Sequence, residues 1–550
     1  MIKRVRAGII GPGIILAALC VASSAAPAEE AKLDAGLDAA DRSHPIFVRM
    51  KNQLFPRGGA YEAFSRQPDH GGRQALRRRV LQTLKDKNGK SWASIAPLVQ
   101  KLASDGSLRS VQRYWIVNGF AGEATAAACR ALAAEDEVAF VYRQPVPYAP
   151  LHRRPLRARA DLEQQHRVHR AVMAAWRDDS DDRLKLEGTA IPWNLKRIGA
   201  DTAWKAEGAT GRGVVVAVLD SGLMLAPGLL GALWRNPQET LDGRDEDGNG
   251  YVDDIFGYNF AAGSGYVLGD GRIITHGSTC AGIIAGRPLN RKRLITGVAP
   301  RAQVMVLRGS GDLRAYQYLA DNGADVLSMS YMWVGVNLGH YRGLYRLAHE
   351  HLAAAGVVAV GGAGNFAAGP KRQPPGRQIA LPKDIPCVIA VAGILENGSR
   401  SPSSSQGPCV WKGVKFYDDY PADAPLAKPD VTACFGGFPV WGRTLSTRHP
   451  QLRYKLLSDE GNGRALISGP QGNSYAGPHA AGVAALILSA NPDLHPWQVK
   501  DLMEATARDL GPAGRDPQFG AGLLDAAAAV RAAKSRLPAA ARPAASVSPR

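Results

Sequence analysis

Three short segments, far apart in the chain, carry the residue types needed for acyl transfer by a serine hydroxyl. Asp220 ends the apolar run VVVAVLDSG, His276 lies at the start of THGSTCAGIIAG, and Ser474 lies at the start of GNSYAGPHAAGVAALIL. A serine hydroxyl is a poor nucleophile at neutral pH unless a base accepts its proton and an anion orients that base. The order acid, base, nucleophile is one known arrangement of such residues. The sequence therefore predicts a catalytic triad of Asp220, His276 and Ser474.

A fourth segment, GVVAVGGAGN at residues 356–365, predicts the group that stabilises the oxyanion. It has the pattern of a strand that runs into a glycine-rich turn, and its last residue is Asn365. The Asn365 amide can donate to the negative oxygen of a tetrahedral intermediate, and so can backbone amides at the start of the helix near Ser474. Taken singly, each of the four residues has an ordinary structural explanation. Their order and shared strand–turn–helix context make chance a poor explanation.

The elements that must position these residues begin near Ile191, where short β-branched runs alternate with helical patterns. Strands are expected at residues 214–219, 304–307, 326–329, 357–360 and 388–391, and helices at 277–285, 316–322, 343–355, 477–490 and 496–507. Strands buried on both faces and separated by helices predict a parallel, doubly wound α/β sheet. Such sheets bind ligands at the carboxyl ends of their strands, where Asp220 is expected.

The domain organisation follows from changes in composition. Residues 29–150 predict a small α+β domain, with helical stretches at 73–87 and 91–102, a strand at 111–120 that ends in an Asn-Gly turn, an alanine-rich helix at 123–134 and a strand at 138–142. Residues 151–188 form a basic linker, for which an exposed, protease-sensitive segment and a solvated polar helix over 161–176 both remain open. The α/β domain is expected at 189–533, followed by a disordered tail at 534–550.

The first 28 of the 550 residues have the pattern of an export signal. Lys3, Arg4 and Arg6 precede an apolar stretch, and small residues at 26–28 match a cleavage site, which predicts a secreted or periplasmic protein. No later segment is long and apolar enough for a transmembrane helix. The formal net charge of +18 favours acidic partners, but the basic linker lacks interleaved aromatic residues, so nucleic-acid binding is not expected. No disulfide pairing is assigned to the six cysteines, and Cys280 is expected to be a buried free thiol.

With these segments the chain resembles the subtilisin-like serine peptidases, or subtilases. The matching motifs are LDSG, HGSTCAGIIAG, AVGGAGN and GNSYAGPHAAGVAAL, and the resemblance covers roughly residues 191–533. It implies an endopeptidase that cleaves proteins or peptides through an acyl-enzyme and needs no cofactor for catalysis. The resemblance implies the triad above, with Asn365 as oxyanion donor. It further implies substrate contacts at Ser330, Met332, Gly362 and Gly364.

The chain departs from the family pattern at several positions. Asn473 precedes the serine where threonine is usual, Gly477 replaces a common alanine, and Met332 stands where the substrate-binding edge normally has glycine. Bulk at Met332 narrows or reshapes the predicted pocket. These departures support a second hypothesis, in which the chain is a catalytically weak or inactive binding protein on a protease fold.

The N-terminal domain resembles the inhibitor-type propeptide of subtilases. The similarity rests on VNGFAGEATAAACRALAAEDEVAFVYRQ at residues 117–144, with its strand–helix–strand order. It implies a zymogen whose own propeptide is an intramolecular inhibitor and folding template, removed by a cut between Arg153 and Ala190. A dense parallel sheet has slow, non-local contacts, which a template helps to form.

One candidate metal site remains, in the segment DEDGNGYVDD at residues 245–254. Asp245, Asp247, Asn249 and Asp253 offer the oxygen ligands that calcium prefers, which predicts a structural calcium ion. Phe256 occupies the position of the bidentate glutamate of an EF-hand, so the loop is not of that type. A surface turn rich in Asp, Asn and Gly explains the pattern equally well, and both interpretations remain open.

Overall fold

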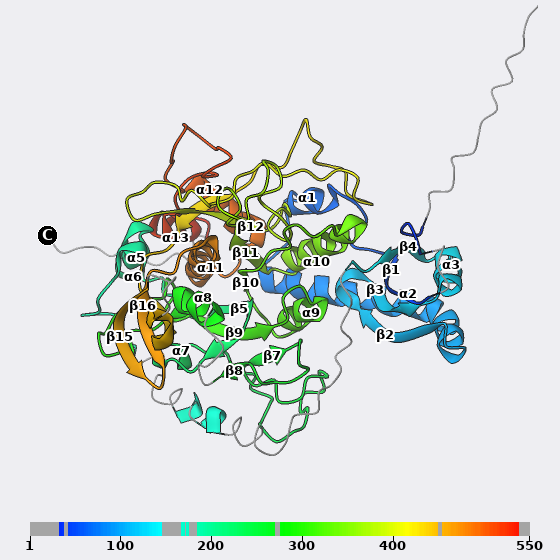
Figure 1. The fold of residues 1–550 in the computed structure, drawn as a ribbon, viewed down its shortest axis with the longest axis horizontal. Coiled ribbons are helices and arrows are strands. Elements are labelled where there is room, and N and C mark those ends of the chain that lie inside the picture. The colour runs from blue at the N-terminus through cyan, green and yellow to red at the C-terminus, as the bar shows by residue number, and fades with distance from the viewer. Residues whose placement is uncertain are drawn as a thin grey trace, which may run out of the picture.

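The computed structural model describes residues 32–37, 42–145, 167–170, 172–174, 184–269, 276–448 and 454–537. The predicted signal peptide, most of the basic linker and nearly all of the predicted tail lie outside the described residues. Figure 1 shows a small N-terminal unit, in blue and cyan, beside a larger α/β domain. No helix over the described residues is both long enough and apolar enough to cross a bilayer.

The α/β domain is built on a seven-stranded sheet with the order β13-β12-β11-β10-β5-β9-β7. Its strands are β5 (Val215–Asp220), β7 (Gly257–Asn259), β9 (Gln303–Arg308), β10 (Val326–Met329), β11 (Val358–Gly362), β12 (Ile389–Ile394) and β13 (Val431–Cys434). Every neighbouring pair is parallel, and Leu327 of β10 pairs with Ala217 on one side and Ala359 on the other. The predicted doubly wound parallel sheet is confirmed.

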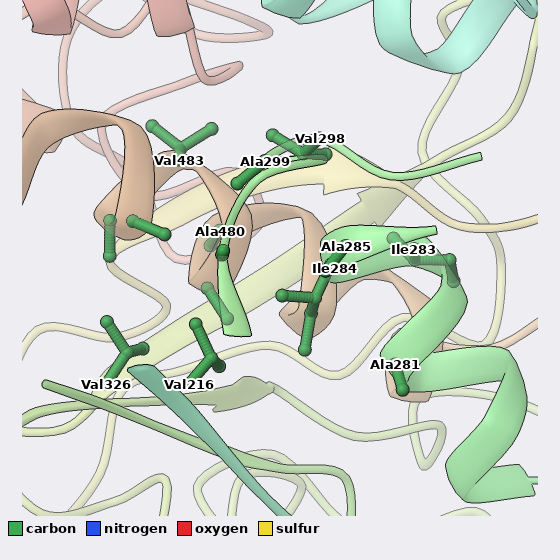
Figure 2. Packing of buried hydrophobic residues seen from close by; sticks show 14 of the residues in the cluster. Val216, Ala281, Ile283, Ile284, Ala285, Val298, Ala299, Val326, Ala480 and Val483 are labelled. Atoms are coloured by element: carbon green, nitrogen blue, oxygen red, sulfur yellow. The ribbon is translucent and has the colours of Figure 1, made fainter. Parts of the chain in front are cut away.

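Helices cover both faces of this sheet. They are α5 (Trp193–Arg197), α6 (Ala200–Glu207), α7 (Pro227–Leu230), α8 (His276–Ala285), α9 (Leu313–Asp321), α10 (Arg342–Ala354), α11 (Asn473–Ala490), α12 (Pro496–Ala505) and α13 (Ala526–Ser535), with short 3-10 turns at Gly339–Tyr341 and Thr444–Arg448. Each strand sends alternate side chains to opposite faces. Val216 and Val218 of β5 join the core with α8, α11 and α13, whereas Ala217 and Leu219 join the core with α9 and α10. Figure 2 shows part of the first core, where Val216 and Val326 lie below Ile284 of α8.

Smaller strands complete the α/β domain. One antiparallel sheet has the order β14-β16-β15, with β14 at Val440–Arg443, β15 at Lys455–Gly461 and β16 at Arg464–Ser468. A two-stranded ladder joins β6 (Leu223–Met224) to β8 (Leu268–Gly269). The five cysteines among the described residues are all buried and free, and Cys280 is one of them.

The N-terminal unit is a four-stranded antiparallel sheet, in the order β2-β3-β1-β4, packed on helices. Its elements are β1 (His44–Met50), α1 (Ala60–Ser65), α2 (Arg73–Ser104), β2 (Leu108–Tyr114), a 3-10 turn at Trp115–Val117, β3 (Gly119–Ala124), α3 (Ala126–Ala134) and β4 (Val138–Arg143). The prediction of a small α+β unit agrees with this arrangement, and the predicted strand at 138–142 is present as β4.

Three predictions for this unit were wrong in detail. The helical stretches at 73–87 and 91–102 form one continuous helix, α2. The polar residues between them stay helical because Asn88 and Ser91 are buried and hydrogen-bond to Asn118. The strand predicted at 111–120 already ends at Tyr114, and a 3-10 turn at Trp115–Val117 precedes the predicted Asn-Gly turn, where Asn118 has a φ of 37°. The helix predicted from residue 123 begins at Ala126, capped by Thr125.

Candidate active site

Asp220 and His276 meet at the carboxyl edge of the central sheet. Asp220 is the last residue of β5, and His276 is the first residue of α8. Nδ1 of His276 lies 2.9 Å from both Oδ1 and Oδ2 of Asp220, and the amide of Ser221 donates to Oδ1 at 2.6 Å. A Cβ at Gly277 would lie 2.3 Å from the Gly222 carbonyl oxygen, so only glycine lets α8 approach the turn after β5 this closely. The aspartate is thus held facing the imidazole.

The electrostatics of this pair suit a base oriented by an anion. Burial alone would raise the pKa of Asp220, but hydrogen bonds from His276 and Ser221 hold it below its ordinary value. The pKa of His276 is raised, first by the charge of a Cys280 thiolate and then by Asp220, while burial lowers it. Burial raises the pKa of Cys280, so its thiol is neutral at neutral pH. Asp220 is therefore the anion that raises the pKa of His276 under those conditions.

Ser474 lies in the first turn of α11, next to the histidine-bearing helix α8. The Ser474 carbonyl accepts hydrogen bonds from Ser330 Oγ at 2.8 Å and from Cys280 Sγ at 3.5 Å. Cys280 Sγ is also 3.9 Å from Nδ1 of His276. Tyr475, which follows Ser474, has its ring centroid 5.8 Å from that of the His276 imidazole. The structure thus brings the segments of all three predicted triad residues together at one edge of the sheet.

Asn365 and the start of α11 border a common space. Oδ1 of Asn365 accepts a hydrogen bond from the Asn473 amide at 2.8 Å. The Nδ2 group of Asn365 takes no part in that bond. A methyl group built on Gly472 would lie 3.3 Å from Nδ2 of Asn365 and 3.8 Å from the Ser474 nitrogen. Both nitrogens therefore lie near the same small volume beside the serine, and their role as oxyanion donors stays a prediction.

Asn473 has a structural task that sequence reasoning missed, although its departure from the family pattern signalled the position. Its side chain is buried, and Nδ2 donates to the Gly364 carbonyl at 2.6 Å and to Ser404 Oγ at 3.1 Å. A Cβ at Gly362 would lie 1.9 Å from the Asn473 carbonyl oxygen. The structure therefore gives Gly362 and Gly364 a part in seating α11 on β11, and their contact with substrate stays a prediction.

The segment predicted to bind substrate begins with Ser330, directly after β10. Met332 is partly buried, and the Trp333 amide donates to the Leu381 carbonyl at 2.9 Å. Beneath the segment lies Lys383, which is 1% exposed and whose ammonium donates to the Tyr331 carbonyl. Burial lowers the pKa of Lys383 to about 7, against the charges of Asp384 and Asp220. Sequence reasoning missed this lysine because nothing local marks it as buried.

Comparison with known proteins supplies the family. The profile of the subtilase family matches residues 211–522, which include all of the proposed catalytic residues. The chain belongs to the subtilase family. The subtilases are serine peptidases, so the chain is assigned to the serine peptidases at the level of its family.

Individual subtilases are similar over the same region. Alkaline elastase YaB from Bacillus sp. (strain YaB) is 28% identical over 350 residues, covering 62% of this chain and 70% of the elastase. Mycosin-1 from Mycobacterium tuberculosis is 28% identical over 363 residues, covering 62% of this chain and 73% of mycosin-1. A crystal structure of MycP1 with its N-terminal propeptide removed matches with 23% identity and a TM-score of 0.42, over 62% of this chain and 98% of that one.

The acidic loop of this subtilase gathers carboxylates around Asp247. The amide of Asn249 donates to Asp245 and Asp247, and its side chain donates to Asp247 and Asp254. Asp253 instead accepts from the amides of residues 242 and 243, so it faces away from that group. Ligand atoms of Glu239, Asp245 and Asp247 lie within 4.8 Å of one another.

Glu239 is the residue of this loop that sequence reasoning missed, because it precedes the acidic motif by six positions. It is 1% exposed, and its Oε2 has no hydrogen-bond partner among the described residues. Burial raises the pKa of Glu239 to about 7, although the amides of Asp247 and Glu246 donate to its other oxygen. An unpartnered, buried carboxylate oxygen beside two further carboxylates fits a hard cation such as calcium.

Proposed function

We propose that this subtilase is a secreted serine endopeptidase that cleaves proteins through an acyl-enzyme on Ser474. The observation that carries the proposal is the hydrogen bonding of His276 Nδ1 to both oxygens of Asp220, beside the helix that begins at Asn473. That bond leaves Nε2 as the nitrogen available to accept a proton from the serine. The proposed chemistry uses side chains and backbone amides alone.

In the proposed reaction, Ser474 Oγ attacks the scissile carbonyl carbon while His276 Nε2 accepts the hydroxyl proton. Asp220 stabilises the imidazolium that forms, and the Asn365 side chain and the Ser474 amide donate to the oxyanion. The C–N bond then breaks as His276 returns the proton to the leaving amine. Water repeats the sequence to release the acyl group and restore the serine.

The precursor form is part of the same proposal. The export pattern at residues 1–28 supports secretion into the periplasm or beyond, and the propeptide resemblance supports synthesis as a zymogen cut between Arg153 and Ala190. The inhibitory role of the N-terminal unit stays a prediction.

Labelling with a fluorophosphonate tests the proposal, because such a reagent reacts with an activated serine. We expect the wild-type protein to be labelled at Ser474, as mapped by mass spectrometry of its peptides, and to cleave casein. Folded, processed protein that takes up no label would instead support the protease-fold binding protein, for which Met332 is the motivating residue. Thermal unfolding of the same sample checks that it is folded.

We also propose that the acidic loop binds one structural calcium ion through Glu239, Asp245 and Asp247. Without a cation, the raised pKa of Glu239 means that the folded state binds an extra proton between about pH 4.5 and 7. The free energy of unfolding therefore falls as the pH rises through that window, and a cation that binds the carboxylate offsets this loss.

Calcium should accordingly stabilise the protein more at pH 8 than at pH 5. At a calcium concentration one hundred times its Kd, the gain in the free energy of unfolding at pH 8 is about 2.7 kcal/mol relative to EDTA. Differential scanning calorimetry of the Ser474→Ala protein measures this without self-digestion. Glu239→Gln should remove the gain and Glu246→Gln should keep it. Equal melting temperatures in calcium and EDTA at pH 8 would show that the loop is only a surface turn.

A further inference from the structure

The first turn of helix α2, in the N-terminal unit, is bound to the α/β domain through Arg73. One guanidinium nitrogen, Nη1, donates to Asp325 Oδ1 at 2.8 Å and to the Gly356 carbonyl at 3.1 Å, and Nε donates to the Pro492 carbonyl at 2.8 Å. The side chains of Arg73 and Asp325 are 3% and 6% exposed. This ion pair is therefore part of the protein interior, where salt screens it only weakly.

A second arginine of α2 completes the contact one turn later. Arg77 is buried, and its guanidinium donates to the Ala355 carbonyl at 2.9 Å and to the Ala324 carbonyl, with Nη1 3.8 Å from Asp325 Oδ1. Among the described contacts of the Asp325 carboxylate, only the Val215 amide comes from the α/β domain itself. Separation of α2 from the α/β domain would therefore break the buried pair of Arg73 and Asp325 together with the hydrogen bonds of Arg77.

Aromatic contacts extend the interface beyond the arginines. Tyr61 and Phe64 of α1 pack against Trp497 of α12, with ring centroids 6.4 and 6.0 Å apart. His70 stacks edge-on against the same indole at 5.1 Å, and His495 bonds the Gly71 carbonyl at 3.1 Å. The N-terminal unit is therefore joined to the α/β domain by aromatic contacts with α12 as well as by ionic contacts. Figure 1 shows α2, in blue, passing beneath α10 into the larger domain.

The arginine contacts lie at the amino ends of the strands, and the catalytic residues lie at their carboxyl ends. Asp325 precedes β10, Gly356 precedes β11 and Val215 begins β5, so all three mark the amino ends of the strands. Asp220 and Ser330 mark the carboxyl ends of β5 and β10. Arg73 and Arg77 can thus stay in place without covering Ser474.

We propose that residues 55–104 remain bound after the linker is cut, so that the mature enzyme is a noncovalent complex of two chains. The segment then acts as a permanent subunit, in contrast to a propeptide that dissociates. This inference goes beyond the proposed function and does not depend on the reactivity of Ser474.

The test uses the full-length Ser474→Ala chain with a recognition sequence for a site-specific protease inserted after Ala160. After complete cutting, shown on a denaturing gel, we expect both fragments to elute together from a size-exclusion column in 1 M NaCl. Separate elution of the N-terminal fragment, with the larger fragment still folded by circular dichroism, would overturn the inference. Because this variant lacks the proposed nucleophile, the result is independent of whether the chain is a protease.

Two variants on α2 then separate the buried ion pair from ordinary surface charge. Arg73→Ala should weaken the complex at least ~100-fold, the effect expected from breaking a buried pair, measured as the Kd between the cut fragments. Lys85→Ala is the matched control, since Lys85 pairs with Asp321 at 2.7 Å across the same interface but both side chains are exposed, 45% and 37%. Equal Kd values for the two variants would contradict the role assigned to Arg73. If Arg73→Ala does not fold, the elution of the unsubstituted complex still decides the inference.

Discussion

Ser474→Ala should abolish peptidase activity, with a loss in kcat of about 10⁶, the size found when the nucleophile is removed from subtilisin. The bonds that seat this turn use the Ser474 carbonyl, which accepts from Ser330 and Cys280, so loss of the hydroxyl leaves them intact. The variant should therefore fold, remain at full precursor length and take up no fluorophosphonate. Casein hydrolysis, gel mobility and labelling measure the three outcomes.

A second serine on the same helix gives the control for this experiment. Ser489 lies near the end of α11, where its hydroxyl accepts from the Gly211 amide at 3.2 Å. Ser489→Ala should mature, be labelled and cleave casein as the wild type does. A Ser474→Ala protein that still matures alone and cleaves casein would refute the assignment of the nucleophile.

The central sheet was predictable because its strands are short, continuous β-branched runs. Residues 326–329 form a strand with the predicted bounds, and 214–219 differs from β5 by one residue at each end. Buried parallel strands carry this signal on both faces, so the sequence alone separates them from surface strands. The places of the triad residues could be predicted for a related reason, since Asp220 ends a strand whereas His276 and Ser474 lie at the starts of helices.

Contacts between distant residues could not be predicted in the same way. Arg73 and Asp325 are 252 positions apart, and one arginine among several on a basic helix gives no sign that it is buried. Lys383 and Glu239 are similar, because their burial depends on packing by other segments. That α2 is one helix instead of two could not be predicted for a related reason. The polar residues Asn88 and Ser91 in its middle are buried against Asn118, which hydrogen-bonds to both.

Asp220→Asn should lower kcat by about 10⁴, with the fold preserved. An amide in this position cannot stabilise the imidazolium, and its NH₂ group favours the tautomer of His276 that carries its proton on the wrong nitrogen. Asp220 also raises the pKa of His276. Its loss should therefore move the acidic limb of the kcat/KM profile to lower pH, because the base then loses its proton more readily.

The pH profile distinguishes this role from a merely structural one, which would lower activity equally at every pH. Asp321→Asn is the control, since Asp321 is an exposed residue at the end of α9 whose partner is Lys85. It should keep the wild-type rate and profile. If Asp220→Asn stays within tenfold of the wild type, or if its acidic limb does not move, the short contact between Asp220 and His276 does not serve catalysis. In that case another group must orient the base that accepts the proton of Ser474.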